Sequence, residues 1–216
     1  MQKPSAALDI TIDVKARIET AQRLGEDNTD LIPCFIAKPK CTCPPDIAEL
    51  VKATSGSLVP LYRYLGPNQF GRYTNHFYTT SPDEIGTTFP GQIGKHGYRS
   101  EGIAAYIYTD PPLLVAPAVV PLYRYYHGKI HDHLYTSDFN ELACGEGNPD
   151  GYNYEGIQGY CFKYSLPGIN RPLYRYYSDN AMDHFYTTNE AEIGTTTIGV
   201  TGKHGYISEG MTCYVA

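Results

Sequence analysis

The chain has 216 residues, of which 17 are Lys or Arg and 23 are Asp or Glu, so its formal net charge is −6. This negative balance argues against a nucleic-acid partner and against electrostatic docking on an anionic membrane. Hydrophobic residues make up 42% of the chain and charged residues 19%, which is typical of a globular protein rather than a disordered one. The 21 Tyr, 21 Gly and 16 Pro residues favour a turn-rich β protein.

Residues 1–58 form an N-terminal extension that does not share the pattern of the later chain. Residues 14–24 place apolar side chains near one face of an amphipathic helix, and residues 46–53 are a second short helix candidate. The sequence shows no signal-peptide core and no apolar run of the roughly 20 residues that span a membrane. We therefore expect a cytoplasmic or non-classically secreted protein without membrane insertion, in which the extension caps the β domain or contacts a second copy in a homodimer.

A cysteine cluster lies in the extension at Cys34, Cys41 and Cys43. It lacks the paired Cys-x-x-Cys arms or matching His spacing of a zinc site. We expect free thiols or one local disulfide there, and neither a metal nor a cofactor.

One pattern occurs three times between residues 59 and 216. Each copy contains a Pro-Leu-Tyr-Arg-Tyr segment, an Asx-His-x-Tyr-Thr segment, and a closing segment that begins with Gly-Tyr, contains Glu-Gly and ends in Tyr. The Glu of the closing segment recurs at positions 101, 155 and 209, so the spacing is 54 residues each time. The copies span 59–110, 120–166 and 171–216.

Each copy predicts three or four strands, with a short helical turn or loop at 83–85 in the first copy and 190–193 in the third. One such unit cannot bury its apolar face alone, so the three copies must share a core. The expected fold is therefore mainly β, with three repeats of about 50 residues around a pseudo-threefold axis. We favour a β-trefoil-like arrangement, with a small three-bladed propeller as the alternative.

These combined motifs resemble a Tyr-rich repeat family catalogued as a domain of unknown function, which recurs in fungal proteins and as modules of secreted bacterial hydrolases. The resemblance covers residues 59–216 in all three copies. It implies carbohydrate or cell-surface binding, as in a mushroom-type lectin. Bacterial members often carry Trp where this chain has Tyr98, Tyr152 and Tyr206.

Each copy has an Arg in its first strand and a Glu in its last strand. We expect these residues to form a structural ion pair that joins the two strands. A catalytic centre is usually unique, so three equivalent glutamates favour a structural role. The expected pairs are Arg63 with Glu101, Arg124 with Glu155, and Arg175 with Glu209.

The Asx-His-x-Tyr segments supply candidate sugar ligands, because a sugar site needs polar groups for hydroxyls and a flat aromatic face. Neighbouring residues on a strand point to opposite faces, so one of each Asx-His pair faces outward or both lie at the start of the strand beside a loop. A His that hydrogen-bonds the backbone and fixes a turn is the alternative interpretation. The candidates are Asn75, His76 and Tyr78, then Asp132, His133 and Tyr135, then Asp183, His184 and Tyr186.

Two loops carry the sequence Gly-Lys-His-Gly-Tyr, in the first copy with Lys95 and His96 and in the third with Lys203 and His204. Exposed loops often hold binding residues, so these four side chains are further ligand candidates, with a solvated turn as the alternative. Near the second copy, His131 and His133 could share one face of a strand, but no third metal ligand is evident.

The sequence contains no Gly-x-Ser-x-Gly, no His-Glu-x-x-His and no phosphate-binding loop. Repetition of every candidate favours multivalent binding over catalysis. The predicted function is therefore a non-enzymatic, fungal-type lectin that binds glycans or glycoproteins. A protein-binding module such as a protease inhibitor is the first alternative, and a hydrolase whose site combines the extension with the repeats is the second.

Overall fold

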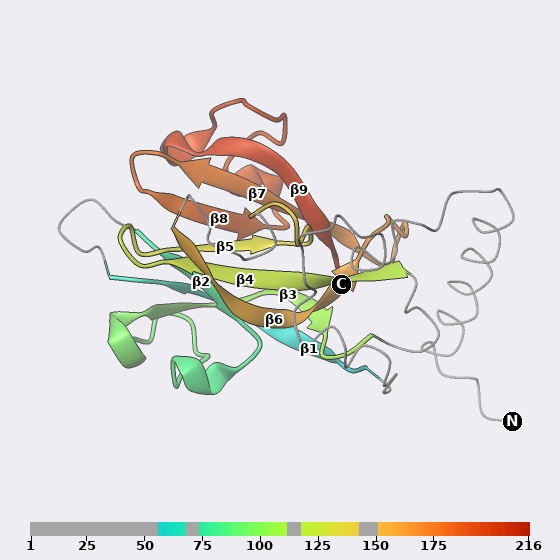
Figure 1. Ribbon diagram of the computed structural model, residues 1–216, viewed down its shortest axis with the longest axis horizontal. Coiled ribbons are helices and arrows are strands. Elements are labelled where there is room, and N and C mark those ends of the chain that lie inside the picture. The colour runs from blue at the N-terminus through green and yellow to red at the C-terminus, as the bar shows by residue number, and fades with distance from the viewer. Residues whose placement is uncertain (1–55, 68–73, 112–117, 143–150) are drawn as a thin grey trace, which may run out of the picture.

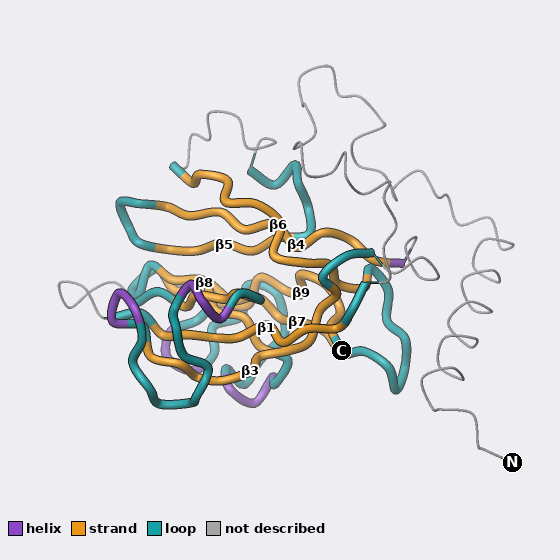
Figure 2. Tube along the Cα trace, turned by 90° about the horizontal axis from the view of Figure 1, so that it is seen from below, coloured by secondary structure: helices purple, strands orange, loops and turns teal. Residues whose placement is uncertain are grey.

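The computed structural model describes residues 56–67, 74–111, 118–142 and 151–216. These residues form nine strands in one antiparallel sheet, and their only helical segments are short 3-10 turns, so the chain is mainly β as predicted. Figure 2 shows how strands and loops make up nearly all of this part of the chain. Both helix candidates of the N-terminal extension lie outside the described residues. Within them, no helix has the length and apolar character needed to cross a membrane.

The strands fall into three successive groups of three, which we call unit 1 (β1–β3), unit 2 (β4–β6) and unit 3 (β7–β9). In each unit the first strand pairs with both of the others. The 3-10 turns η3 (Pro82–Glu84) and η7 (Glu190–Glu192) follow the second strands of units 1 and 3, where the sequence predicts a helical turn or loop. The strands are β1 (Leu58–Leu65), β2 (His76–Thr79), β3 (Arg99–Tyr108), β4 (Val119–His127), β5 (Asp132–Thr136), β6 (Tyr152–Phe162), β7 (Arg171–Ser178), β8 (Asp183–Thr187) and β9 (Ile207–Val215).

Two irregularities in the pairing of the first and last strands recur in every unit. In unit 1 the register shifts between Leu61 and Tyr62 and again between Arg63 and Tyr64. The second shift leaves Glu101 without a partner across the ladder, and the next residue, Gly102, has a φ of 90° that favours glycine. A bulge of this kind turns a side chain out of the regular alternation. The Glu-Gly step therefore sets the direction of the glutamate side chain in each unit.

Three tyrosines, one from each second strand, meet at the centre of the molecule. Tyr78, Tyr135 and Tyr186 are each about 1% exposed, and their ring centroids are 5.4 Å apart in all three pairs. Each hydroxyl donates to the backbone carbonyl of the next tyrosine and accepts its N–H, at distances of 2.7–2.8 Å. Figure 1 shows β8, β5 and β2 side by side at this centre, in agreement with their contacts. These hydrogen bonds satisfy the backbone of one strand with a side chain from another unit.

The last strands of the units meet at one end of the core. Tyr108 of β3 pairs with Tyr160 of β6, and Phe162 of β6 pairs with Tyr214 of β9. Two backbone hydrogen bonds of 3.1 Å then join Tyr106 of β3 to Ala216, directly after β9. The last strand of each unit thus contacts the other two.

A buried disulfide joins units 2 and 3. It links Cys161 of β6 to Cys213 of β9, which are 52 residues apart. Its neighbours in the core include Leu61, Leu122 and Leu173, which occupy matching positions in the three first strands. The sequence did not predict this disulfide, because the two cysteines occupy different positions of the repeated pattern.

We predict that Tyr135→Phe lowers the free energy of unfolding by about 2–4 kcal/mol, because it leaves a buried N–H and a buried carbonyl of Tyr78 without their partner. Chemical denaturation monitored by circular dichroism measures the change. Tyr106→Phe, at a side chain that is 42% exposed, is the matched control and should shift the value by less than about 0.5 kcal/mol. Equal effects of the two substitutions would contradict the structural role of the triad.

We also predict that the double variant Cys161→Ala, Cys213→Ala loses about 2–4 kcal/mol of unfolding free energy, since the disulfide closes a loop of 52 residues in the unfolded chain. Denaturation with and without a reductant measures this loss. Reductant should destabilise the wild type and have much less effect on the double variant. The same sensitivity in both proteins would assign the effect to other cysteines.

Candidate functional site

The three places where neighbouring units meet share one arrangement of polar side chains. At the junction of units 3 and 1, the carboxylate of Asp183 lies at the start of β8 and is fully buried. It accepts hydrogen bonds from the backbone N–H of His76 at 2.7 Å and from the Tyr206 hydroxyl at 2.5 Å, and its Oδ2 lies 2.5 Å from His76 Nδ1. Burial and the charge of Asp183 raise the pKa of the Tyr206 hydroxyl. An aspartate of unit 3 therefore holds a histidine of unit 1.

The junction of units 2 and 3 has the same arrangement. Asp132, at the start of β5, accepts from the backbone N–H of His184 at 2.8 Å, and its Oδ2 lies 2.6 Å from His184 Nδ1. The Tyr152 hydroxyl also donates to Asp132. Burial by itself would raise the pKa of Asp132, but the charge of His184 and these hydrogen bonds outweigh it and lower the pKa below its ordinary value.

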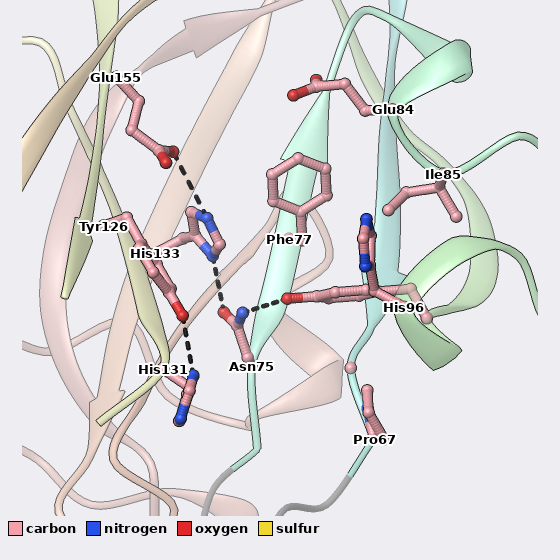
Figure 3. Close-up of a pocket in the computed structure, with 12 residues that line it drawn as sticks. Pro67, Asn75, Phe77, Glu84, Ile85, His96, Tyr126, His131, His133 and Glu155 are labelled. Atoms are coloured by element: carbon pink, nitrogen blue, oxygen red, sulfur yellow. Dashed lines mark hydrogen bonds and ion pairs between the residues drawn. The ribbon is translucent and has the colours of Figure 1, made fainter. Parts of the chain in front are cut away.

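The junction of units 1 and 2 differs, because an amide replaces the carboxylate. Asn75 Oδ1 lies 3.0 Å from His133 Nδ1, and Asn75 Nδ2 donates to the Tyr98 hydroxyl. Figure 3 shows His133 between Asn75 and Glu155. This junction keeps the hydrogen-bonding path of the others without their buried negative charge.

An arginine in the first strand of each unit bridges two carboxylates. In unit 2, Arg124 Nε lies 2.9 Å from Glu155 of the same unit, and Nη2 lies 3.0 Å from Glu84 of unit 1. Burial would raise the pKa of Glu155, but a hydrogen bond from His133 and the charges of His133 and Arg124 lower it. Both glutamates are therefore held as ion-paired carboxylates.

The same bridge exists at the other two junctions. Arg63 lies 2.7 Å from Glu101 and 3.0 Å from Glu192, and Arg175 lies 2.8 Å from Glu209 and 2.7 Å from Glu141. The three ion pairs expected within units are thus present, and each arginine has a second partner in the preceding unit.

The histidine of each junction connects these two groups. Its Nε2 lies 3.5–3.9 Å from the glutamate that pairs with the arginine of its own unit. A polar path therefore runs at each junction from a tyrosine hydroxyl through Asx, His and Glu to Arg. The paths are Tyr206–Asp183–His76–Glu101–Arg63, Tyr98–Asn75–His133–Glu155–Arg124, and Tyr152–Asp132–His184–Glu209–Arg175.

Among the described residues, two cavities open over these polar paths. The first, which we call cavity 1–2, has a volume of about 490 Å³ and lies between units 1 and 2. The second, cavity 3–1, has a volume of about 420 Å³ and lies between units 3 and 1. Both combine aromatic rings with imidazoles and carboxylates, which suits a ligand that has an apolar face and several polar groups. The principal lining residues are Asn75, Phe77, Glu84, His96, Tyr98, Tyr126, His131, His133 and Glu155 in cavity 1–2, and Arg63, Leu65, Thr74, His76, Glu101, Phe185, Glu192, His204 and Tyr206 in cavity 3–1.

The predicted ligand residues lie in three kinds of place: the walls of the cavities, the loops beside them, and the central core. His96 and His204 line the two cavities, each in a left-handed loop conformation with a φ of 57° or 59°. Lys95 and Lys203 instead donate to the backbone carbonyls of Asp83 and Ala191 and so close their own loops. The two lysines therefore stabilise the loops that carry them.

The Asx-His pairs lie at the start of their strands, and both members are buried. His76 and His133 each line a cavity, and the partner of every histidine in these pairs is the Asx of another unit rather than its own neighbour in sequence. Tyr78, Tyr135 and Tyr186 lie in the central core, so we correct their expected role from ligand contact to packing and backbone hydrogen bonding. The alternation of side chains along a strand does not reveal which face meets a neighbouring unit.

Several residues of the junctions were missed in the sequence. Glu84, Glu141 and Glu192 bind the arginine of the next unit, and Tyr126 lines cavity 1–2. His131, considered in the sequence only as a metal ligand, also lines this cavity. A signal for the glutamates exists, because each follows the Thr of the Tyr-Thr segment by five residues. Nothing comparable marks Tyr126.

The metal interpretation of His131 and His133 finds no support among the described residues. His131 Nδ1 lies 2.8 Å from the Tyr126 hydroxyl, and His133 Nδ1 is directed to Asn75. No group of three or more His, Cys, Asp or Glu side chains in the part of the chain that the structure describes could hold a metal ion.

A protein-family model described as a domain of unknown function (DUF5648) matches residues 46–162 and again residues 121–216. The chain belongs to this family. One match covers units 1 and 2 and the other covers units 2 and 3, so each contains one complete junction. No curated protein and no solved structure matches the chain. The resemblance to a mushroom-type lectin stays a prediction.

We predict that Asp132→Asn lowers the free energy of unfolding at pH 7 by about 1.5–3 kcal/mol, the usual contribution of hydrogen bonds to a charged group. Because folding lowers the pKa of Asp132, its stabilisation is present above the ordinary value of 3.8 and is lost as the pH falls through the lower value of the folded protein. The difference in unfolding free energy between the wild type and the variant should therefore become smaller in strongly acidic solution.

Urea denaturation at a series of pH values measures this dependence. Asp179→Asn, at an exposed aspartate, is the control and should have little effect at any pH. A deficit of the Asp132 variant that stays constant from pH 7 to pH 3 would show that the charge of Asp132 does not stabilise the junction.

Proposed function

We propose that this protein is a multivalent, non-enzymatic carbohydrate-binding protein whose binding sites are the cavities at the junctions between units. The observation that carries the proposal is the composition of these cavities. Each combines a tyrosine or phenylalanine ring with imidazole and carboxylate groups, at the size of a mono- or disaccharide site. Sugars need such a combination, because they present apolar C–H faces together with hydroxyl groups.

We further propose that the three units are arranged about a pseudo-threefold axis that passes through the tyrosine triad, in a trefoil-like manner. The cyclic hydrogen bonds of Tyr78, Tyr135 and Tyr186 support this arrangement. The cyclic contacts of β3, β6 and β9 support it as well. Units of three strands also differ from the four-stranded blades of propellers.

The ion pairing of the cavity carboxylates favours binding over catalysis. Glu84 and Glu155 face the same cavity, as a pair of glycosidase carboxylates would, but Arg124 binds both of them. The lowered pKa of Glu155 makes it a poor proton donor near neutral pH. Ion-paired carboxylates are suited to accepting hydrogen bonds from ligand hydroxyls. A hydrolase site that includes residues 1–58 would lie partly outside the described residues.

A protein-binding module, such as a protease inhibitor, is the second candidate. It is favoured by exposed apolar side chains on matching loops of units 1 and 3, where Phe89 is 69% exposed and Ile198 is 73% exposed. Backbone hydrogen bonds from Gly91 to Ser100 and from Gly199 to Ser208 hold these loops against the last strands. An inhibitor of this kind would act through one loop rather than through several cavities.

The buried disulfide is evidence on the cellular compartment in which the protein is found. Disulfides persist in oxidising environments and are rare in the reducing cytosol. The bond between Cys161 and Cys213 therefore favours an oxidising compartment over the cytosol.

We predict that the purified protein binds a coherent set of glycans on an array, and that His96→Ala and His204→Ala each weaken binding in part. The two side chains are exposed and line different cavities, so their removal leaves the polar paths below intact. The double variant should lose much more than either single variant, because linked weak sites bind a multivalent surface by avidity.

Tyr164→Ala, at a tyrosine that is 46% exposed and lines neither cavity, is the matched control and should bind like the wild type. Loss of all binding in one single variant would indicate one site rather than several. The absence of glycan binding by the wild type at high array density would overturn the proposal and direct the work to protease-inhibition assays.

A further inference from the structure

The two cavities are built from matching positions, so they can be compared within one molecule. In each, two glutamates share one arginine, and a phenylalanine ring lies beneath the guanidinium group at about 5 Å. Each also has a histidine from a Gly-Lys-His-Gly loop and a tyrosine that follows the loop. The matched pairs are Phe77 with Phe185, Glu84 with Glu192, Glu155 with Glu101, His96 with His204, and Tyr98 with Tyr206.

Two differences between the cavities change their charge. Where cavity 3–1 has the buried carboxylate of Asp183 behind His76, cavity 1–2 has the neutral amide of Asn75. Where Thr74 lines cavity 3–1, His131 lines cavity 1–2, and both residues directly precede the Asx of the second strand. Cavity 1–2 thus has one negative charge fewer and one imidazole more.

A third difference concerns shape. Tyr126 lines cavity 1–2 at the position where Leu65 lines cavity 3–1, and its hydroxyl lies 2.8 Å from His131 Nδ1. Figure 3 shows His131 on one side of Asn75 and His96 on the other. Imidazoles thus line the cavity on either side of the neutral amide, with Tyr98, to which Asn75 donates, on the side of His96.

This difference decides which ligand charge each cavity tolerates. A buried charge is weakly screened, so the carboxylate of Asp183 disfavours an anionic ligand in cavity 3–1 although it lies behind His76 and does not line the cavity. In cavity 1–2 the remaining carboxylates, Glu84 and Glu155, are both paired with Arg124. Imidazole N–H groups donate to carboxylates, and these hydrogen bonds strengthen when the ring is protonated.

We propose that cavity 1–2 is the site for a sugar that carries a carboxylate, such as a uronic acid, and that cavity 3–1 accepts only neutral sugars. This inference rests on the proposed carbohydrate-binding function and deepens it, because it names the ligand class of one site. The ligand carboxylate lies over Asn75 between His131 and His96, and the ring of Tyr126 provides an apolar face.

The experiment compares uronic-acid oligosaccharides with their carboxyl-reduced counterparts, which have the same linkages without the charge. Isothermal titration calorimetry on the full chain measures affinity and stoichiometry for both probes. Wild-type protein should bind the acidic form more tightly than the reduced form, and added salt should weaken only the acidic complex.

Asn75→Asp gives cavity 1–2 the carboxylate that the other two junctions have naturally, so the fold is expected to tolerate it. It should weaken binding of the acidic probe on the order of tenfold or more and affect binding of the reduced probe much less. Asn153→Asp adds the same charge at an exposed position outside both cavities and is the matched control, which should bind like the wild type.

The double variant Thr74→His, Asp183→Asn transfers the pattern of cavity 1–2 to cavity 3–1. It should raise the stoichiometry for the acidic probe from one to two, and it tests the inference even if Asn75→Asp does not fold. Equal affinity of the wild type for both probes, or an unchanged acidic affinity in Asn75→Asp, would overturn the inference and leave the carbohydrate-binding function standing. The absence of binding to any glycan would overturn the function and the inference together.

Discussion

The need to satisfy buried polar groups across unit boundaries organises this structure. The second strand of each unit is entirely buried, and its central tyrosine has a backbone N–H and carbonyl that bind a hydroxyl from another unit. A buried backbone group without a partner costs about 1–3 kcal/mol. No unit supplies these partners for itself, so each depends on its neighbours for polar contacts as well as for apolar burial.

The same requirement builds the candidate site. The Asx at the start of the second strand has its tyrosine partner in its own unit and its histidine partner in the next. The arginine likewise pairs with one glutamate of its own unit and one of the preceding unit. The cavities lie where these paths cross from one unit to another, so their lining residues are held in place by the contacts that stabilise the fold. A preorganised site of this kind loses little conformational entropy when a ligand binds.

A shared framework also explains how the junctions can differ. The polar path survives the replacement of Asp by Asn at position 75, because an amide can accept from one neighbour and donate to another. The charge of a junction can therefore change while its hydrogen-bonding path and fold are preserved. His131 and Thr74 line the cavities without belonging to the path, so the residue at this position can differ between the two cavities without breaking the path.

The sequence by itself determined the repeated strands and the pairing of Arg63 with Glu101 inside a unit. These features depend on local rules, namely alternation along a strand, a glycine with positive φ and a bulge that turns one side chain. Only the tertiary structure decided that His76 binds Asp183 rather than its neighbour Asn75, and that Tyr78 belongs to the core. The partner of His76 is 107 positions away and those of Tyr78 are 57 and 108 positions away, and a repeated pattern does not specify which copy lies next to which. That choice follows from the packing of three units around shared tyrosines, and it placed the cavities between units instead of within them.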